Sequence, residues 1–367
     1  MTLAACGQGS GPSRPSGPGS GTTEVVYRLS PGLSGPLTGA AEAQLLTALR
    51  GRLADAGMIV TATTRTGRRL DVLIAGTHTS HDDRLRLADL GEQGRLFFYD
   101  WEPNVIGPGP RPAPKQAVVT GGPDAGDSQF GLPLYQAVIR GSHRRLISRP
   151  NDTTASAFYL VSDRTRKVLR GPAPRPGELV SSGRPPGSRT VEVRAGTVII
   201  EAARPEDVAH PKQLGYYVLN DDPLISNADI QDPQAGVDEG FGATGQPDVS
   251  FGFTNQGTRA FALLTRAVAR RGQLAGRGGE PSPESYQHYA VVLDDRLLAV
   301  PYVSYVQHPN GIDPAGGTRI VGGFTAAIAA ELASILRYRP LPVSLLLESV
   351  RKLTPVRKQT PVRKPAR

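Results

Sequence analysis

The sequence predicts an α+β fold made of two subdomains, each with its own sheet and helices. The first hundred residues follow a β-α-β-β order, a split piece of a ferredoxin-like fold that needs one further strand. Between residues 213 and 338, strand patterns alternate with two amphipathic helices. A loop-rich insertion separates the two parts. A last strand at residues 343–347 is expected to return to the first sheet and close it.

The composition limits the class of protein. Of the 367 residues, 43 are Gly and 33 are Pro, which indicates long linkers and loops. The net charge of +9 is typical of a solvated surface with a basic tail, or of attraction to an anionic membrane face. No aromatic-basic motif accompanies this charge, so we expect no nucleic-acid partner. The chain as given has no run of about 18 apolar residues, so no transmembrane helix is predicted.

Cys6 is the only cysteine, which excludes a disulfide within the chain and a Cys-based zinc site. It ends a Leu-Ala-Ala-Cys sequence that resembles the lipobox of bacterial lipoproteins, in which the cysteine becomes lipidated. Too few residues precede it for a full signal peptide, so a chance cysteine in a leader is the alternative. Gly, Ser and Pro then dominate up to residue 22, as in a flexible tether. We therefore expect residues 1–22 to combine a lipidation site and a tether.

The first subdomain begins with a strand at residues 24–29. Thr38 can cap a helix through its hydroxyl, and Gly57 is a C-terminal stop signal. Two strands are predicted next, at residues 58–64 and 70–75. The helix between Thr38 and Gly57 buries a face of leucines at helical spacing, namely Leu45, Leu46, Leu49 and Leu53.

A short helix at residues 85–90 and a strand at residues 95–99 complete this part. Before them, His78 and His81 lie in the sequence GTHTSHDD. Histidines three residues apart share one face only on a helix, and the preceding Gly76 favours a loop. We therefore expect a polar turn that caps the next helix rather than a metal site.

Residues 101–190 are predicted to be a loop-rich insertion. Residues 97–106 have the pattern of a strand that runs out into an extended segment. We expect Trp101 to cover the edge of the sheet; a sugar-stacking aromatic beside acids is the alternative. The insertion holds a short helix and a small hairpin, at residues 132–140 and at residues 158–162 and 167–169.

The second subdomain is reached through a strand at residues 191–200. An alternating strand at residues 249–253 leads into a helix that Asn255 caps and Gly272 ends. One face of this helix is apolar and is made of Phe261, Leu264 and Val268.

A hairpin at residues 288–300 turns at Asp294 and Asp295, and a strand follows at residues 318–321. Thr325 caps the last helix, which Pro340 and Pro342 stop. An apolar stripe along that helix consists of Ile328, Leu332, Ile335 and Leu336.

The C-terminus is basic and repeats the sequence TPVRK at residues 354–358 and 360–364. A basic segment punctuated by prolines cannot build a core. It is interpreted as a disordered, solubilising tail, with electrostatic contact to anionic lipid headgroups as the alternative.

Four stretches occur in a fixed order: YYVLNDDPLISNADI, DVSFGFTNQGTRAFALLTRAVARRG, VVLDDRLLAVPYV and GGTRIVGGFTAAIAAELASILRYRPLP. The order of these stretches and their amino-acid sequences resemble the first extracytoplasmic (P1) domain of SecD, the accessory subunit of the bacterial protein-export channel. The sequence FYDWEPNV resembles the actinobacterial type. The resemblance spans residues 24–348 and implies base and head subdomains. The segments that follow from it and from the composition are 1–22, tether; 23–100, base; 101–190, insertion; 191–212, connection; 213–338, head; 339–349, return strand; and 350–367, tail.

The resemblance implies a non-enzymatic role in protein translocation. In that family the head holds emerging unfolded polypeptide, and movement of base against head is powered by proton flow through membrane helices shared with SecF. In this chain the basic tail stands where those helices would follow. We therefore expect a lipid-tethered domain on the outer face of the cytoplasmic membrane, without its own proton-driven motor. Its expected partners are exported polypeptide, Sec channel subunits, SecF and the membrane surface. The alternative is an envelope adapter that binds a folded partner complex.

Four aromatic residues of the head are predicted to contact polypeptide, namely Phe251, Phe253, Tyr302 and Tyr305. For Phe251 and Phe253 the alternative is a role in the sheet core. Motifs of hydrolases, P-loop proteins and zinc proteases are absent from the sequence, and we predict no enzyme, cofactor or metal. The acid pairs Asp221-Asp222 and Asp294-Asp295 are assigned to turns, where Asp forms local hydrogen bonds.

Overall fold

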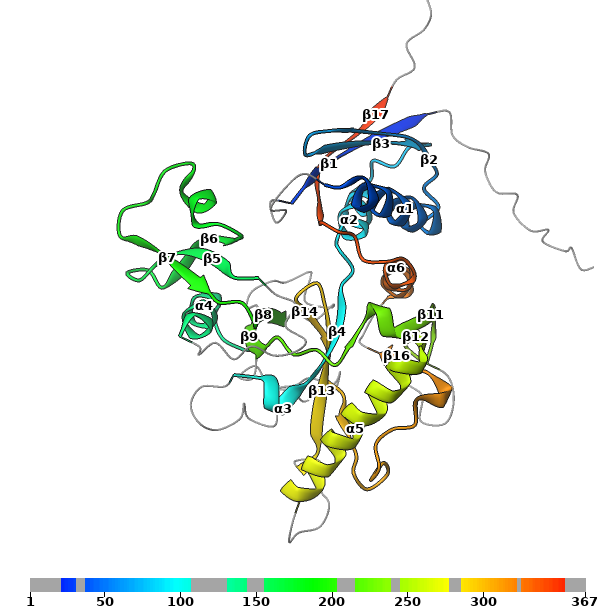
Figure 1. Ribbon diagram of the computed structural model, residues 1–367. Helices are drawn as coiled ribbons and strands as arrows, with labels where there is room; N and C mark the ends of the chain where they lie inside the picture. Colours follow the sequence, from blue (N-terminus) through cyan, green and yellow to red (C-terminus); the bar gives the residue numbers. More distant parts are fainter. Residues whose placement is uncertain are drawn as a thin grey trace, which may run out of the picture.

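The computed structural model describes residues 21–30, 37–106, 131–143, 155–202, 215–238, 245–276, 285–321 and 325–353. The predicted lipidation site Cys6, most of the tether and the TPVRK repeats lie outside these residues. The described part is an α+β protein with four sheets (Figure 1). Within it, no helix combines the length and apolar character needed to cross a membrane.

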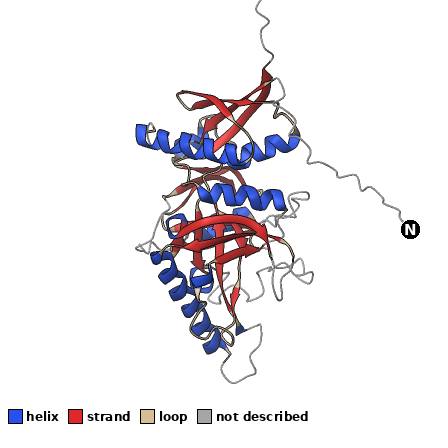
Figure 2. Ribbon diagram, turned by 90° about the vertical axis from the view of Figure 1, so that its right-hand side faces the viewer, coloured by secondary structure: helices blue, strands red, loops and turns tan. Residues whose placement is uncertain are grey.

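The first subdomain is a four-stranded antiparallel sheet with the order β17-β1-β3-β2. Helices lie beneath this uppermost sheet in Figure 2. Thr38 caps α1 by accepting a hydrogen bond from Ala41 N, and Gly57 follows with φ +77°. Leucines of α1 and α2 pack on one face of the sheet in a shared core. The elements are β1 (Thr22–Leu29), α1 (Gly39–Asp55), β2 (Val60–Thr66), β3 (Arg69–Ala75), α2 (His81–Leu90) and β17 (Leu345–Leu353).

The last strand returns to β1, as the sequence predicts, but it is longer than residues 343–347. β17 pairs with the whole of β1, from Thr22 opposite Leu353 to Leu29 opposite Leu345. It therefore includes residues 350–353, which were assigned to the tail. Arg351 and Lys352 fit in this strand because both are exposed, and Arg351 Nη2 lies 2.8 Å from Glu24 Oε2.

The second subdomain is organised around a seven-stranded sheet with the order β10-β4-β13-β14-β8-β9, and β15 pairs with β13. Two predictions are wrong here. The strand at residues 95–99 was placed in the first subdomain, yet it pairs along its length with β13. The single strand at residues 191–200 is two strands in different sheets, because the chain turns at Gly196 with φ +74°. The strands are β4 (Leu96–Asp100), β8 (Thr197–Ala202), β9 (Gly215–Asn220), β10 (Ile225–Ser226), β13 (Gln287–Leu293), β14 (Arg296–Ala299) and β15 (Tyr302–Val303).

A three-stranded sheet, β11-β12-β16, completes the second subdomain with two helices. The cap of α5 is Thr254, one residue before the predicted Asn255, and its hydroxyl accepts from Gly257 N. The helix also continues past Gly272, which serves close packing instead: a Cβ there would lie 2.9 Å from the Tyr305 ring. Thr325 caps α6 as predicted. The elements are β11 (Ile230–Val237), β12 (Pro247–Phe253), α5 (Asn255–Ala275), β16 (Thr318–Val321) and α6 (Ala326–Arg337).

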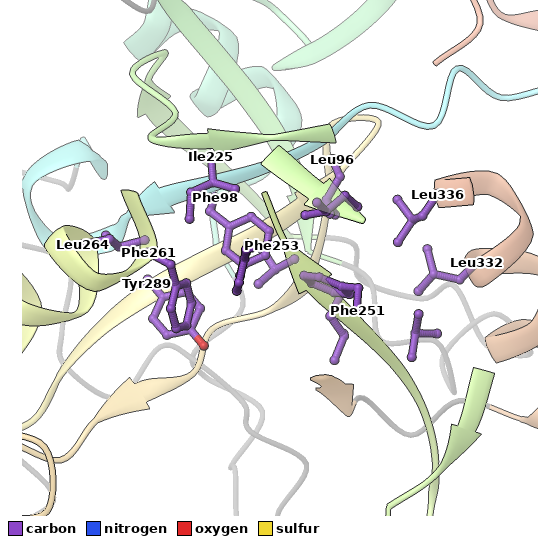
Figure 3. Packing of buried hydrophobic residues seen from close by; sticks show 14 of the residues in the cluster. Leu96, Phe98, Ile225, Phe251, Phe253, Phe261, Leu264, Tyr289, Leu332 and Leu336 are labelled. Carbon is purple, nitrogen blue, oxygen red and sulfur yellow. The ribbon is translucent and has the colours of Figure 1, made fainter. Parts of the chain in front are cut away.

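The core of the second subdomain is aromatic (Figure 3). The Phe98 ring of β4 meets four other rings, with centroid distances of 6.1–6.5 Å. Phe253 and Phe261 stack with centroids 4.9 Å apart. Edge-to-face and offset rings of this kind stabilise a core beyond their buried area. The rings around Phe98 belong to Phe251, Phe253, Phe261 and Tyr289.

The insertion forms a module of its own, at the left of Figure 1. Its predicted hairpin is joined by a third strand, giving the sheet β6-β5-β7, and α4 packs on one face. The extended segment predicted after β4 is instead a helical turn, α3. Trp101 is 4% exposed there, with its ring 5.1 Å from that of Tyr217. The elements are α3 (Trp101–Asn104), α4 (Leu134–Ser142), β5 (Ala157–Ser162), β6 (Lys167–Ala173) and β7 (Ser188–Val193).

Candidate functional site

Three tyrosines form a surface cluster beside α5, which we call the tyrosine patch: Tyr286, Tyr302 and Tyr305. Tyr302 is 51% exposed and stacks on Tyr286, with ring centroids 5.1 Å apart and planes at 12°. Tyr305 meets Tyr286 edge-on at 5.5 Å. Its hydroxyl lies 3.0 Å from Ser285 Oγ, and its ring packs over Gly272. The patch is therefore an exposed aromatic surface whose inner ring is fixed by the helix behind it.

A network of charged side chains joins β13 to α3 and α5 next to the patch. His288, opposite Tyr302 in the ladder, lies with its Nδ1 2.8 Å from Glu102 Oε1. Arg271 of α5 pairs with Asp100 and lies 3.9 Å from Glu102. Burial raises the pKa of Asp100 to about 6, although the Arg271 guanidinium opposes this rise. The network thus holds a carboxyl group that titrates near neutral pH.

Asp100 should make stability depend on pH. Its ordinary pKa is 3.8 and its folded pKa about 6, so the folded chain binds the proton more tightly. The resulting stabilisation is complete below 3.8, is lost as the pH rises through 6, and amounts to at most about 3 kcal/mol. We expect the free energy of unfolding of the wild type, relative to Asp100→Asn, to fall over this range. Urea unfolding at several pH values measures it; a difference that does not vary with pH would contradict this assignment.

The four predicted contact residues do not form one surface. Phe251 and Phe253 are 3% and 7% exposed and lie in the aromatic core (Figure 3). Their side chains are not available to a ligand in this conformation, in keeping with the core alternative. Tyr302 is exposed, and Tyr305 is half-buried behind it. Of the four residues, Tyr302 is therefore the best placed to touch a partner.

A second candidate is a groove of about 1060 Å³ where the two subdomains meet, which we call the junction groove. It runs between the first half of β11 and the turn after α6. Amide side chains line it, of which Gln44, Gln93 and Asn227 already bond within the fold, and apolar residues supply contact area. Sequence patterns do not reveal this groove, since its lining comes from four separate stretches. Its amide residues are Gln44, Gln93, Asn227, Gln231 and Gln234.

Arg52 fixes the junction beside this groove. It is fully buried on α1 and donates to the carbonyl oxygens of Glu92 at 2.6 Å and Gln93 at 2.9 Å. It also donates to Leu90 O at 3.2 Å and Ile335 O at 3.4 Å. Burial lowers its pKa to about 10. One side chain therefore holds the end of α2, the outgoing connection and the end of α6.

The outgoing and returning connections are also bonded to each other. Leu341 N donates to Gln93 O at 2.8 Å, and Leu345 N donates to Gly91 O at 2.7 Å. On the far side, the Asp294 carboxylate accepts from Gly94 N and Arg95 N. The hydrogen bonds of Arg52, of the two connections and of Asp294 thus help to set the relative position of the two subdomains.

His78 and His81 lie at the turn before α2 and at its first residue. Ser80 and Asp83 form a reciprocal capping box at the start of α2, and the ring of His78 lies 3.0 Å from Ala75 O. Across the ranges that the structure describes, no group of three or more His, Cys, Asp or Glu side chains is arranged to hold a metal.

Part of the chain is similar to known protein-export subunits. Residues 202–343 match the family model "SecDF, P1 head subdomain". The protein translocase subunit SecD of Rickettsia prowazekii (strain Madrid E) is 29% identical over 140 residues, covering 38% of this chain and 22% of that protein. Protein translocase subunit SecDF of Thermus thermophilus is 26% identical over 230 residues, covering 61% and 25%. SecD of Streptomyces coelicolor is 32% identical over 106 residues, covering 29% and 16%.

Solved structures of SecDF are distantly similar. The super-membrane-facing form of SecDF aligns with a TM-score of 0.44 at 20% identity, over 90% of this chain and 30% of that one. A SecDF chain described as a membrane component that enhances protein export gives 0.41 at 19% identity, over 89% and 99%. These low scores carry no further argument. The chain spans about a quarter or less of the length of the curated relatives above. From the family model and these relatives, the predicted resemblance to SecD is confirmed: residues 202–343 match the SecDF P1 head subdomain, and the relatives described above are SecD and SecDF proteins.

Proposed function

We propose that this chain is a non-enzymatic, extracytoplasmic SecD-type domain that assists protein export by binding translocating polypeptide. The family match supports this, because the relatives are named as protein translocase subunits. Partners would be the exported chain, Sec channel subunits and SecF. In this proposal a separate component supplies the energy.

The observation that carries the proposal is the tyrosine patch. Tyr302 and Tyr286 present stacked rings at the surface, and Tyr305 anchors them to α5. Aromatic faces with a hydroxyl group offer apolar contact and a hydrogen bond together, and they lose little rotamer freedom on binding. Such a surface suits unfolded chains of varied sequence. The junction groove would add contacts for the peptide backbone.

The first subdomain would serve as the base. Its order β17-β1-β3-β2 with two helices fits the split ferredoxin-like arrangement that the sequence suggests. Thr22 and Leu353 face each other across the β1–β17 ladder, so the chain enters and leaves the sheet at one end. A lipid on Cys6 and a basic tail would then act at the same end of the domain. Both anchors would hold the base at the outer face of the membrane.

Tyr302→Ala is expected to weaken binding of an unfolded, fluorescently labelled model polypeptide. Loss of one exposed aromatic contact is worth about 1 kcal/mol, or roughly fivefold in affinity, and Tyr302→Ala with Tyr305→Ala should lose more. Fluorescence anisotropy titration measures the change. Leu263→Ala is the matched control, because Leu263 is 64% exposed on α5 and is not part of the patch.

Equal affinities of wild type, single and double variants would contradict the polypeptide proposal. Recovery of one stable folded partner, with no affinity for unfolded chains, would favour the envelope-adapter alternative. Circular dichroism of each variant shows whether the fold is retained, which separates a lost contact from a lost structure.

A further inference from the structure

The insertion module contains a second cavity, which we call the arginine pocket. It has a volume of about 610 Å³ and lies between α4 and the β5–β6 turn. It is separate from the tyrosine patch and the junction groove in sequence and shares no lining residue with either. The pocket is lined by Ile106, Tyr135, Gln136, Ile139, Arg140, His143 and Arg166.

One face of α4 makes most of this pocket. Tyr135, Ile139 and His143 follow each other at intervals of four residues, and Gln136 and Arg140 do the same, so all five lie along one side. The other side of α4 is buried against the sheet through Ala137, Val138 and Gly141. Because that side is buried, the side of α4 that lines the pocket faces outward. The β5–β6 turn places Arg166 beside it.

The charges at the pocket are unbalanced. Within the described part of the chain, neither the Arg140 nor the Arg166 guanidinium has a hydrogen bond or ion pair. Burial lowers the pKa of Arg140. Both arginines contrast with many arginines of the same chain that pair with carboxylates, among them Arg65 with Glu42, Arg86 with Glu331 and Arg337 with Asp55.

Asp163, which bonds the pocket residue Tyr135, already has partners. Asp163 accepts from Arg189 Nε at 2.6 Å and Nη2 at 3.2 Å, and from Tyr135 Oη at 2.7 Å. The Arg189 hydrogen bond, followed by that of Tyr135, holds the pKa of Asp163 below its usual range. His143 Nδ1 lies 2.8 Å from Ile139 O, to which it donates. The two guanidinium groups and the Gln136 amide are thus hydrogen-bond donors that line this cavity.

We propose that the arginine pocket binds a phosphate group. Guanidinium forks form paired, charge-assisted hydrogen bonds with phosphate oxygens, and two forks match the several oxygens of one phosphate. Ile106, Ile139 and the Tyr135 ring provide apolar contact for the organic part of a phosphate ester. The phosphate belongs either to a soluble ester or to a phospholipid headgroup. This site is independent of polypeptide binding.

Isothermal titration of the full chain with inorganic phosphate and with glycerol 1-phosphate, at constant ionic strength, tests the proposal. We expect saturable binding that Arg140→Gln and Arg166→Gln each weaken about tenfold or more, as for loss of a charge-assisted contact. Arg164→Gln is the matched control, because it removes the same charge from the same turn without lining the pocket. Among the described residues neither pocket arginine has a hydrogen bond or ion pair, so the variants should keep the wild-type melting temperature.

A second arm identifies the source of the phosphate. Sedimentation with phosphatidylglycerol vesicles, compared with phosphatidylcholine vesicles, should show a loss in Arg140→Gln and Arg166→Gln if the ligand is a headgroup, and no difference if it is a soluble ester. Binding in neither arm would overturn the site. Equal weakening by Arg164→Gln, or equal competition by polyglutamate, would also overturn it, because the surface would then attract anions without a specific phosphate site.

Discussion

Replacing Arg52 by alanine is expected to lower the free energy of unfolding by about 3–5 kcal/mol, because four carbonyl oxygens, two in buried and two in part-buried bonds, lose their donor. The carbonyls belong to Leu90, Glu92, Gln93 and Ile335. An uncompensated buried acceptor costs its full desolvation energy, and the deleted side chain also leaves a cavity.

The loss should also change how the two subdomains sit. Arg52 projects from α1, whereas Glu92 and Gln93 belong to the outgoing connection and Ile335 to α6. The backbone bonds between the connections, the contacts of Asp294 and the ion pairs that α6 makes with the first subdomain, Arg86–Glu331 and Arg337–Asp55, would remain. With the four Arg52 bonds lost, we expect a broader distribution of distances between the first and second subdomains.

Urea unfolding measures the first effect, and spin-label distances between β2 and α5 measure the second. Arg50→Ala is the control, since Arg50 lies on the same helix and makes an exposed bond to Thr63 Oγ1 at 2.8 Å. Arg52→Lys should recover little, because an ammonium group cannot reach four acceptors as a planar fork does. Unchanged stability and unchanged distances in Arg52→Ala would refute its role at the junction.

Phe98→Ala should destabilise the second subdomain by about 3–5 kcal/mol. Phe98 is 1% exposed and touches four aromatic rings, so its removal opens a cavity at the centre of that core. The cost depends on how far neighbouring rings can relax into the space.

Hydrogen exchange read by mass spectrometry shows where the loss occurs. Protection should fall in β12, α5 and β13, while β1 and α1 keep theirs, because Phe98 has no place in the first core. Phe97→Ala is the control, since Phe97 lies on the other face of β4 and is only partly buried. A loss of protection centred on the first subdomain would show that β4 belongs with it after all.

Local signals in the sequence predicted local structure well. Thr38 and Gly57 mark the ends of α1, and the Asp294-Asp295 turn has φ values of 47° and 61°, as a tight hairpin requires. The SecD-like sequence between residues 216 and 341 indicated a resemblance, which the match of residues 202–343 to the SecDF P1 head subdomain confirms. The helix ends and the turn depend on neighbouring residues, and the resemblance depends on stretches of similar sequence.

Long-range pairing could not be predicted from the same signals. The sequence pattern of β4 indicates a strand but not the strand with which it pairs. Its antiparallel pairing with β13, almost two hundred residues away, was therefore missed. Alternation put Phe251 and Phe253 on one face of β12 without showing that Phe98 and Phe261 cover that face. Arg52 carries no sequence signal, because its acceptors are backbone oxygens brought together by the fold.

Photo-crosslinking in cells tests the central claim most directly. A benzophenone amino acid at Tyr302, with the same probe at Leu263 as control, reports what touches each surface of the second subdomain. We expect the probe at Tyr302 to capture many different exported polypeptides together with Sec channel subunits, and the probe at Leu263 to capture few. Capture of a single folded partner at Tyr302, or equal capture at both positions, would contradict a polypeptide-binding role for the tyrosine patch.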